Sequence, residues 1–284
     1  MSVPWLARRV IAYAHQGGSY EGPSSTLTAI ERALRNGASA VELDVHATKD
    51  RHIVVCHDNT VDATTNGRGA IANLTLAEVR ELDNAYWFIP GATVTPGRSD
   101  EEYRDRGKAP GDRDYGVATL EEVAVRFPGV LLNLDIKGVA PDVEAYEELL
   151  ANDLRRLELN SSVMVASFHD VALENFRLVA PDVATSAATN ETAMFFFSMG
   201  EGSPVIPSVS AFQVPATFGD ITVVDERFVE TAHEHHIAVH VWTINDEEEM
   251  NRLVDLGVDG IVSDRPALLA QVLRSRGVAW DGAL

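Results

Sequence analysis

Short apolar runs alternate with amphipathic segments along most of the chain. Runs of this kind are typical of buried strands, whereas apolar residues at helical spacing predict helices. The runs that we predict as strands cover residues 10–14, 40–45, 53–57, 130–136, 162–167, 183–187, 210–214, 237–243 and 259–262. The segments that we predict as helices cover residues 26–36, 75–82, 119–126, 141–158, 170–178, 190–198, 225–235 and 246–256.

This alternation predicts an α/β fold built on a mostly parallel sheet. Repeated about eight times in a chain of 284 residues, it predicts a closed (β/α)8 TIM barrel forming a single domain over residues 1–284. The nine predicted strands exceed eight, so one is either wrong or an additional strand, and the gap between residues 45 and 53 is too short for a helix. Residues 84–117, rich in proline, glycine and charge, are predicted to form a loop insertion within the domain.

Local signals mark some of the helix ends. Thr26 and Thr119 are positioned to cap the helices that follow them, the latter in a capping box with Glu122. Gly37 is positioned to end the first helix.

Composition and charge disfavour several classes of partner and location for this protein. The chain is 45% hydrophobic, and 23 basic against 43 acidic residues give a net charge of −20, which disfavours nucleic acid and anionic bilayers as partners. No apolar run reaches the ~18 residues of a membrane span, and the run after Arg9 is too short for a secretory signal. The single cysteine, Cys56, cannot form an intrachain disulfide, which fits a cytoplasmic location.

Ionisable residues are placed inside the apolar run 40–45. Alternate residues of a strand share a face, so Glu42, Asp44 and His46 point to one side. Two adjacent carboxylates repel each other unless a cation lies between them, and such hard oxygen ligands suit Mg²⁺, Ca²⁺ or Mn²⁺. We favour a metal site over a solvent-facing or lysine-paired arrangement.

The run 131–137 repeats this pattern, with Asn133, Asp135 and Lys137 on one face. Asp135 is a candidate third carboxylate ligand, and Lys137 is a candidate partner for an anionic oxygen. A partly buried Asp–Lys pair explains the same pattern, and taken alone it is the more common case.

Two histidines, His15 and His57, end predicted strands. Histidine titrates near neutral pH, so the pair can act as acid and base in one reaction. Cys56 alternates away from His57 and is predicted to be inert packing. Trp242, near the end of another strand, is a candidate pocket wall or a core residue. The turn at residues 64–69 could contact a phosphate through its amides, although a plain turn is equally consistent with it.

Taken in order, these motifs resemble the glycerophosphodiester phosphodiesterase family over about residues 10–270. The motifs that carry the resemblance are His15-x-Gly17, Gly37–Val45, Thr48–Asp50, Val54–Asp58, Thr64–Gly69, Thr119–Glu122, Asp135–Lys137, Val241–Asn245 and Gly257–Pro266. The resemblance implies a distorted (β/α)8 barrel and a divalent metal, commonly Mg²⁺ or Ca²⁺. It also implies the hydrolysis of a small glycerophosphodiester to glycerol 3-phosphate and an alcohol.

The resemblance further implies roles for individual residues. The metal ligands would be Glu42, Asp44 and Asp135. The acid–base pair would be His15 and His57, Lys137 would stabilise phosphate charge, and Gln16 and Trp242 would contact the substrate.

The chain departs from the family pattern in three places. Gln16 replaces an arginine, which removes a bidentate phosphate-binding cation. Ser24-Ser25 replaces Glu-Asn, and Asp135 replaces a glutamate, shortening a candidate metal ligand by one methylene.

Two alternatives follow. A lysophospholipase D-like activity would need a larger apolar mouth, for which Tyr86–Ile89 and Met194–Phe197 are candidates. A non-catalytic phosphodiester-binding barrel is the other alternative, motivated by Gln16 and Ser24-Ser25. The oligomeric state is left open.

Overall fold

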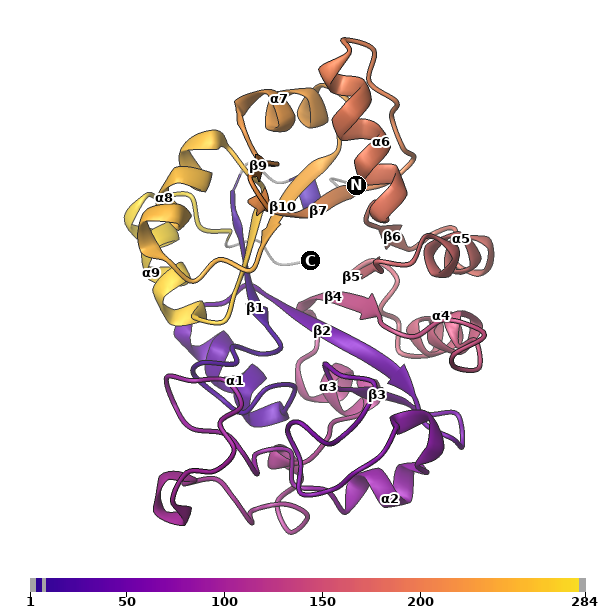
Figure 1. Ribbon diagram of the computed structural model, residues 1–284, viewed down its shortest axis with the longest axis vertical. Helices are drawn as coiled ribbons and strands as arrows, with labels where there is room; N and C mark the ends of the chain where they lie inside the picture. Colours follow the sequence, from indigo (N-terminus) through magenta and orange to yellow (C-terminus); the bar gives the residue numbers. More distant parts are fainter. Residues whose placement is uncertain (1–3, 7–8, 281–284) are drawn as a thin grey trace.

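The computed structural model describes residues 4–6 and 9–280. Eight strands pair in parallel in the order β6-β5-β4-β2-β1-β11-β10-β7, and they surround a common axis (Figure 1). A backbone hydrogen bond of 2.8 Å from Ala187 N to Ala211 O links the β6 edge to β7 and nearly closes the barrel. The predicted TIM-barrel class is therefore confirmed. The wall strands are β1 (Ile11–His15), β2 (Ala40–Ala47), β4 (Leu131–Ile136), β5 (Val163–Ala166), β6 (Ala184–Thr185), β7 (Ala211–Pro215), β10 (Ala238–Trp242) and β11 (Gly260–Ser263).

Helices cover the outside of this wall (Figure 1). Thr26 and the Thr119–Glu122 capping box cap the N-termini of their helices, and Gly37 caps the C-terminus of the first helix, as predicted. The helices of this layer are α1 (Leu27–Asn36), α3 (Leu120–Arg126), α4 (Glu147–Arg156), α5 (Asp170–Val179), α6 (Thr189–Gly200), α7 (Glu226–Glu234), α8 (Glu247–Leu256) and α9 (Pro266–Ser275).

Two helices differ from the prediction. The pattern did not predict α9, which starts with Pro266 in its first turn, where a missing N–H costs nothing. The predicted helix 141–158 is wrong over its first residues, because α4 begins only at Glu147. Tyr146 precedes it and turns inward, where its hydroxyl donates to Val45 O at 2.8 Å and accepts from Gly138 N at 3.1 Å.

The ninth predicted strand is real but lies off the barrel path. Strand β3 (Ile53–Val55) pairs antiparallel with the end of β2, so the short gap between them is a hairpin. The polypeptide from β3 to α3 forms α2 (Leu76–Arg80) and the 3-10 turns η2 (Ile71–Asn73), η3 (Asp100–Glu102) and η4 (Arg113–Tyr115).

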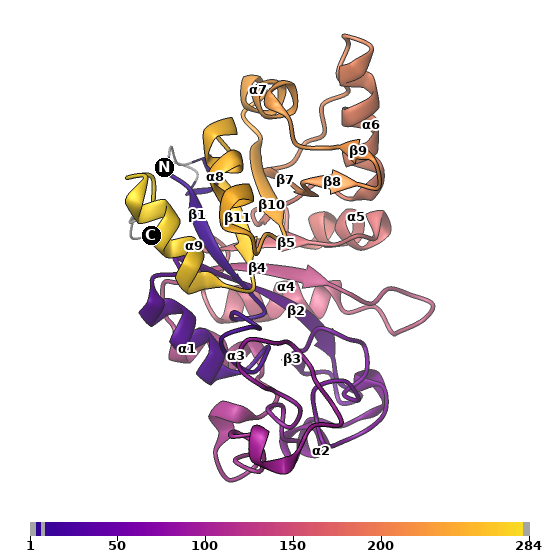
Figure 2. The ribbon, with the colours of Figure 1, turned by 60° about the vertical axis from the view of Figure 1, so that its left-hand side comes forward.

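Irregular segments extend the barrel on two opposite sides. The loops around α2 lie at one end of the molecule, whereas α6 and a hairpin of β8 (Thr217–Phe218) and β9 (Ile221–Thr222) lie at the other (Figure 2). The pattern did not predict this hairpin, whose side chains are exposed.

Alternate residues of a barrel strand face the helix layer and the barrel interior. The apolar members of β2, such as Leu43 and Val45, pack outward against the helices, which points Glu42 and Asp44 inward. A second cluster around Trp5 and Tyr13 fills the barrel interior and includes the first residues of several strands. The 3-10 turn η1 (Pro4–Leu6) supplies Trp5. None of the helices in the part of the chain that the structure describes is both long and apolar enough to cross a bilayer.

Candidate active site

Three carboxylates from neighbouring strands line the inside of the barrel. The β2–β4 register pairs Asp44 with Asp135, and the β1–β2 register pairs His15 with Glu42. All three carboxylates are buried. Parallel pairing of these strands is what brings together residues that are more than ninety positions apart in the sequence.

Lys137 partly neutralises this group. Its Nζ lies 2.9 Å from Asp44 Oδ1 and 3.3 Å from Asp135 Oδ2. The other oxygens, Asp44 Oδ2 and Asp135 Oδ1, are buried without a hydrogen-bond partner. An unpaired buried carboxylate oxygen is costly, so the arrangement has unused capacity for a cation.

Burial and mutual repulsion raise the pKa values of two of these carboxylates. Burial and the charge of Asp44 raise the pKa of Glu42 to about 8. Burial raises the pKa of Asp135 to about 6, with Lys137 opposing this shift and Asp44 adding to it. Both shifts report concentrated negative charge away from water.

The buried carboxylates have donor atoms of the kind that suits a divalent ion. Carboxylate oxygens are the ligands that Mg²⁺ and Ca²⁺ prefer, and two of the oxygens here lack partners. Within residues 4–6 and 9–280, however, no three His, Cys, Asp or Glu side chains are already arranged as a group that could hold a metal ion. Two of the carboxylates are instead joined through Lys137. The residues fit the ion chemically, and loading it would require these side chains to reorient.

His15 is held by a residue to which the sequence pattern assigned no role. Its Nδ1 lies 2.6 Å from Oδ1 of Asp264, which follows β11. Asp264 also accepts hydrogen bonds from Ser19 Oγ at 2.5 Å and from Asn245 Nδ2 at 2.7 Å. The available signal was the barrel itself, because closure places the last strand beside the first, with Ala14 opposite Ser263.

This pairing favours the charged forms of both groups. Burial alone would lower the pKa of His15, but the hydrogen bond to Asp264 and the charges of Glu42 and Asp44 outweigh it and raise the pKa to about 9. Burial would raise the pKa of Asp264, yet hydrogen bonds from His15, Ser19 and other donors hold it below its usual range.

The second histidine approaches from the antiparallel strand. His57 follows β3, and its ring centroid lies 6.4 Å from that of His15, with the two rings at 84°. Its Nδ1 lies 2.8 Å from Asp58 Oδ1, and its side chain is 44% exposed. The structure thus brings the two predicted histidines together, one largely enclosed and one open to solvent.

The two predicted substrate-contacting residues lie in different places. Gln16 lies next to the histidines, with its side-chain nitrogen 3.3 Å from His15 Nε2 and its backbone N–H bonded to Glu42. Trp242 ends β10 and packs edge-to-face on Phe168 at 5.6 Å. Lys137 Nζ lies 5.8 Å from the Phe168 ring centroid, so this aromatic pair borders the carboxylate group.

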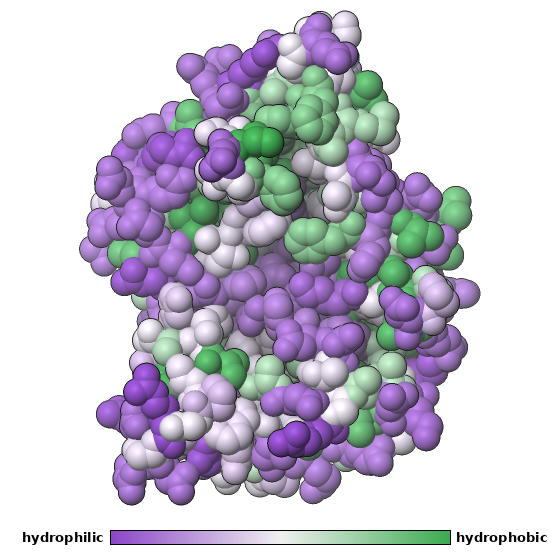
Figure 3. Space-filling view, viewed as in Figure 1, coloured by the Kyte–Doolittle hydropathy of each residue, from purple (hydrophilic) through white to green (hydrophobic). Residues whose placement is uncertain are grey.

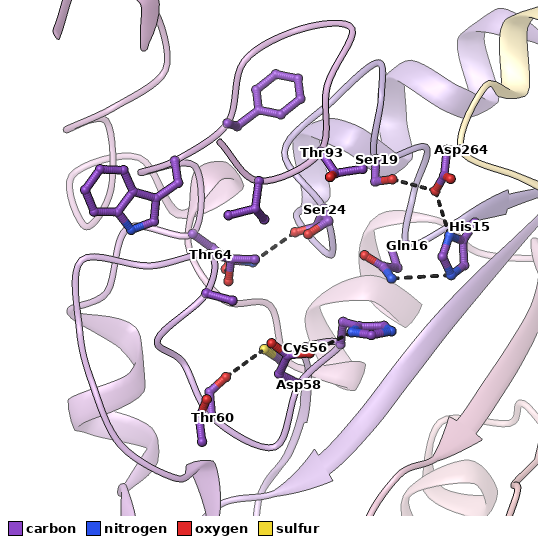
Figure 4. A pocket seen from close by; sticks show the side chains of 16 residues that line it. His15, Gln16, Ser19, Ser24, Cys56, Asp58, Thr60, Thr64, Thr93 and Asp264 are labelled. Carbon is purple, nitrogen blue, oxygen red and sulfur yellow. Dashed lines mark hydrogen bonds and ion pairs between the residues drawn. The ribbon is translucent and has the colours of Figure 1, made fainter. Parts of the chain in front are cut away.

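A cavity of about 300 Å³ opens beside the histidines (Figure 4). It lies between the ends of β1 and β3 and the loop 84–94. The residues that line it are His15, Gln16, Ser19, Ser24, Cys56, His57, Asp58, Thr60, Ala63, Thr64, Asn84, Trp87, Phe88, Thr93, Val94 and Asp264.

Two other sequence-based expectations concern the edges of this region. Cys56 is buried among the apolar residues around β3, and burial raises the pKa of its thiol to about 12, in agreement with the prediction of inert packing. In the turn at residues 64–69, the amides of Gly67 and Gly69 donate to Thr65 Oγ1 and Asp62 Oδ1. Both of these amides are therefore used internally, as the plain-turn interpretation expects.

Residues 15–268 match the model of the glycerophosphoryl diester phosphodiesterase family. Together with the barrel, this match defines a phosphoric diester hydrolase. The chain belongs to this family, which confirms the family resemblance and the predicted class of enzyme.

Individual relatives agree with this placement. The chain is 28% identical over 269 residues to a glycerophosphodiester phosphodiesterase of Caldanaerobacter subterraneus, covering 95% of this chain and 100% of the relative. A crystal structure of a protein from Silicibacter pomeroyi superimposes with a TM-score of 0.74 at 24% identity, covering 99% and 100% of the two chains. A phosphodiesterase from Oleispira antarctica, solved in complex with the product sn-glycerol-3-phosphate, superimposes with a TM-score of 0.70 at 22% identity, covering 95% and 98%.

Proposed function

We propose that this protein hydrolyses glycerophosphodiesters to glycerol 3-phosphate and an alcohol. The observation that carries the proposal is the pair of imidazoles, whose ring centroids lie 6.4 Å apart, beside the buried Asp44 and Asp135, each of which has one oxygen without a hydrogen-bond partner. The product complex of the Oleispira antarctica phosphodiesterase supports the same chemistry in a related barrel.

The carboxylates Glu42, Asp44 and Asp135 would hold Mg²⁺ or Ca²⁺. When bound, the ion supplies positive charge and Lewis acidity at the phosphate. Lys137 adds a fixed ammonium beside the carboxylates, where it can pair with a phosphate oxygen. Gln16, next to His15, offers the phosphate an uncharged amide.

The histidines divide the proton transfers. Because Asp264 stabilises the imidazolium form of His15, we assign this residue as the acid that protonates the leaving alcohol. His57, half exposed, takes the proton from the attacking glycerol hydroxyl. The cyclic phosphate that results is opened by water, with the two roles reversed: His15 takes the proton of water, and His57 returns its proton to the glycerol oxygen. Both histidines regain their starting states.

The direct test is alcohol release. Purified protein with added Mg²⁺ or Ca²⁺ should release choline and glycerol 3-phosphate from glycerophosphocholine. Metal binding without release from any glycerophosphodiester would instead support the non-catalytic alternative.

We expect a small-molecule substrate in the cytoplasm and a single domain over residues 1–284, on the basis of composition and strand pattern.

One observation favours a second candidate, the lysophospholipase D-like activity. An apolar rim lies at the mouth of the barrel next to Lys137, and Figure 3 shows hydrophobic side chains gathered over α6 and β9. Phe218 is 72% exposed and Phe197 is 65% exposed. We define the apolar rim as Phe168, Met194, Phe197, Phe218, Ile221 and Trp242.

Of the two segments predicted for an apolar mouth, one contributes to this rim, whereas Trp87 and Phe88 of the other line the cavity beside the histidines. Met194 and Phe197 are exposed. In the segment 86–89, by contrast, Tyr86 and Trp87 pack around the guanidinium of Arg106, whose central carbon lies 4.3 and 4.8 Å from their ring centroids.

Comparing substrates tests the second candidate. If the rim binds an acyl chain, lysophosphatidylcholine should be cleaved faster than glycerophosphocholine at equal concentration, and Phe218→Ser should reduce that advantage. Equal rates in the wild type, or an advantage that the variant leaves intact, would rule out this use of the rim.

A further inference from the structure

The cavity beside the histidines is built from three separate stretches of chain. They are the turn after β1, the segment after β3 and the loop 84–94 (Figure 4). The apolar rim belongs to the opposite side of the barrel mouth, because β7 lies across the wall from β1 and β2 in the strand order. The cavity and the apolar rim therefore offer two separate directions for the substituents of a phosphate placed between His15 and His57.

The cavity contains no basic side chain apart from the two histidines. None of its lining residues, all within the described chain, is Lys or Arg. Its carboxylates are already engaged, since Asp58 pairs with His57 and Asp264 pairs with His15. A second phosphate or a carboxylate on the substrate would find no lysine or arginine here.

The lining offers free hydroxyl groups on a fixed frame. Asn84 is buried, and its side chain accepts from Thr64 Oγ1 and donates to Ser24 O, which ties all three stretches together. The lining also includes the hydroxyls of Ser24, Thr60 and Thr93, and within residues 4–6 and 9–280 none of the three has a hydrogen bond to another protein group. Each can both donate and accept.

The aromatic part of the wall disfavours a cationic guest. Quaternary ammonium groups bind to aromatic faces, but the Arg106 guanidinium carbon already lies 4.8 Å from the Trp87 ring centroid and 3.6 Å from that of Tyr103. A second positive charge at Trp87 would meet that of Arg106 at short range.

We propose that this cavity binds the alcohol portion of the substrate, and that this alcohol is an uncharged polyhydroxyl compound such as glycerol or inositol. The free hydroxyls bind the hydroxyls of the alcohol, and Trp87, Phe88 and Val94 cover its carbon skeleton. This inference rests on the proposed hydrolysis of glycerophosphodiesters, and it names the preferred leaving group.

Substrate preference tests it. The wild type should show a kcat/KM at least about tenfold higher for glycerophosphoglycerol and glycerophosphoinositol than for glycerophosphocholine. Thr60→Val and Thr93→Val remove one hydroxyl each at nearly constant volume. Each should lower this ratio about 2–10-fold, the value of one hydrogen bond. The matched control is Thr222→Val, on the exposed hairpin away from the cavity, which should leave the ratio unchanged.

The possible failures are distinguishable. Equal values for the polyol and choline substrates, or a ratio that neither variant lowers, would overturn the inference while leaving the proposed function standing. No hydrolysis of any of the three compounds would overturn both. The wild-type ratio requires no variant, so misfolding of a variant does not remove the test.

Discussion

His15 and Asp264 are 249 positions apart in the sequence, yet their side chains meet at 2.6 Å. The contact exists because β11 pairs with β1 and places Asp264 beside the end of the first strand. Ser19 and Asn245 hold the carboxylate from two other directions. Asp264 therefore acts on the reaction through His15, as a positioning residue that fixes the orientation and charge of the imidazole.

Replacing Asp264 tests this relationship. Asp264→Asn keeps the size of the side chain but removes its charge, so the imidazolium form of His15 loses its main support. We expect kcat to fall about 100-fold, within the usual range for a perturbed acid–base group. The pH profile should also change shape, because the pKa of His15 should fall. Ser19→Ala is the matched control, since it removes a neighbour of Asp264 but leaves the His15 contact. Loss of activity with an unchanged pH profile would indicate a structural role alone.

His57 gives a second prediction. His57→Ala should lower kcat about 10²–10⁴-fold, because no other base is paired with His15 in the proposed mechanism. The side chain is 44% exposed, so the melting temperature should stay close to that of the wild type. His169→Ala, at another exposed strand end, should retain full activity. More than about a tenth of wild-type turnover in the His57 variant would contradict an essential role.

Metal binding can be followed without measuring turnover. A ligand present at about 100 times its Kd stabilises the fold by about 2.7 kcal/mol, so Mg²⁺ or Ca²⁺ should raise the melting temperature by several degrees. Glu42→Gln should abolish this rise. The variant should still fold without metal, because burial and Asp44 raise the pKa of Glu42 to about 8 and already favour a neutral side chain near pH 7.

A surface acid supplies the control for the metal experiment. Glu31→Gln removes an exposed partner of Arg35 and should keep the metal-induced rise. If the wild type showed no rise, or if Glu42→Gln showed the same rise as the wild type, these carboxylates would not be the metal ligands.

Stability should depend on His240 in acid. Burial lowers the pKa of this core histidine from 6.5 to about 4. Between these values the unfolded chain binds more protons than the folded one, so acidification through this window destabilises the fold. We expect His240 to account for a loss of about 2 kcal/mol between about pH 8 and pH 5. Denaturant unfolding of wild type and His240→Gln at both pH values measures this loss, which should be absent from the variant.

His233 should behave in the opposite way. Its hydrogen bond to Asp259 raises its pKa, so its contribution to stability is present below the unfolded pKa and is lost as pH rises through the folded one.

A wild type and a His240→Gln variant that lose equal stability on acidification would contradict the assignment to His240.

Much of the fold could be predicted from local pattern. The nine strands of the main sheet were predicted because apolar runs bury locally, and Thr119 and Gly37 marked helix ends through short-range hydrogen bonds. Helix α9 escaped prediction, and α4 was predicted too long, because Tyr146 leaves the helix for contacts with Val45 and Gly138. Such contacts depend on distant strands and leave no trace in local periodicity.

The sequence by itself determined which chemistry-bearing residues face inward, because strand alternation places Glu42 and Asp44 on one side whatever the neighbours are. It also identified the two histidines at strand ends. Only the tertiary structure decided the partners: Lys137 between two carboxylates, Asp264 on His15, and Arg106 among the aromatic rings. Pairing of this kind is set by strand order, register and barrel closure, which join positions that no short sequence window contains.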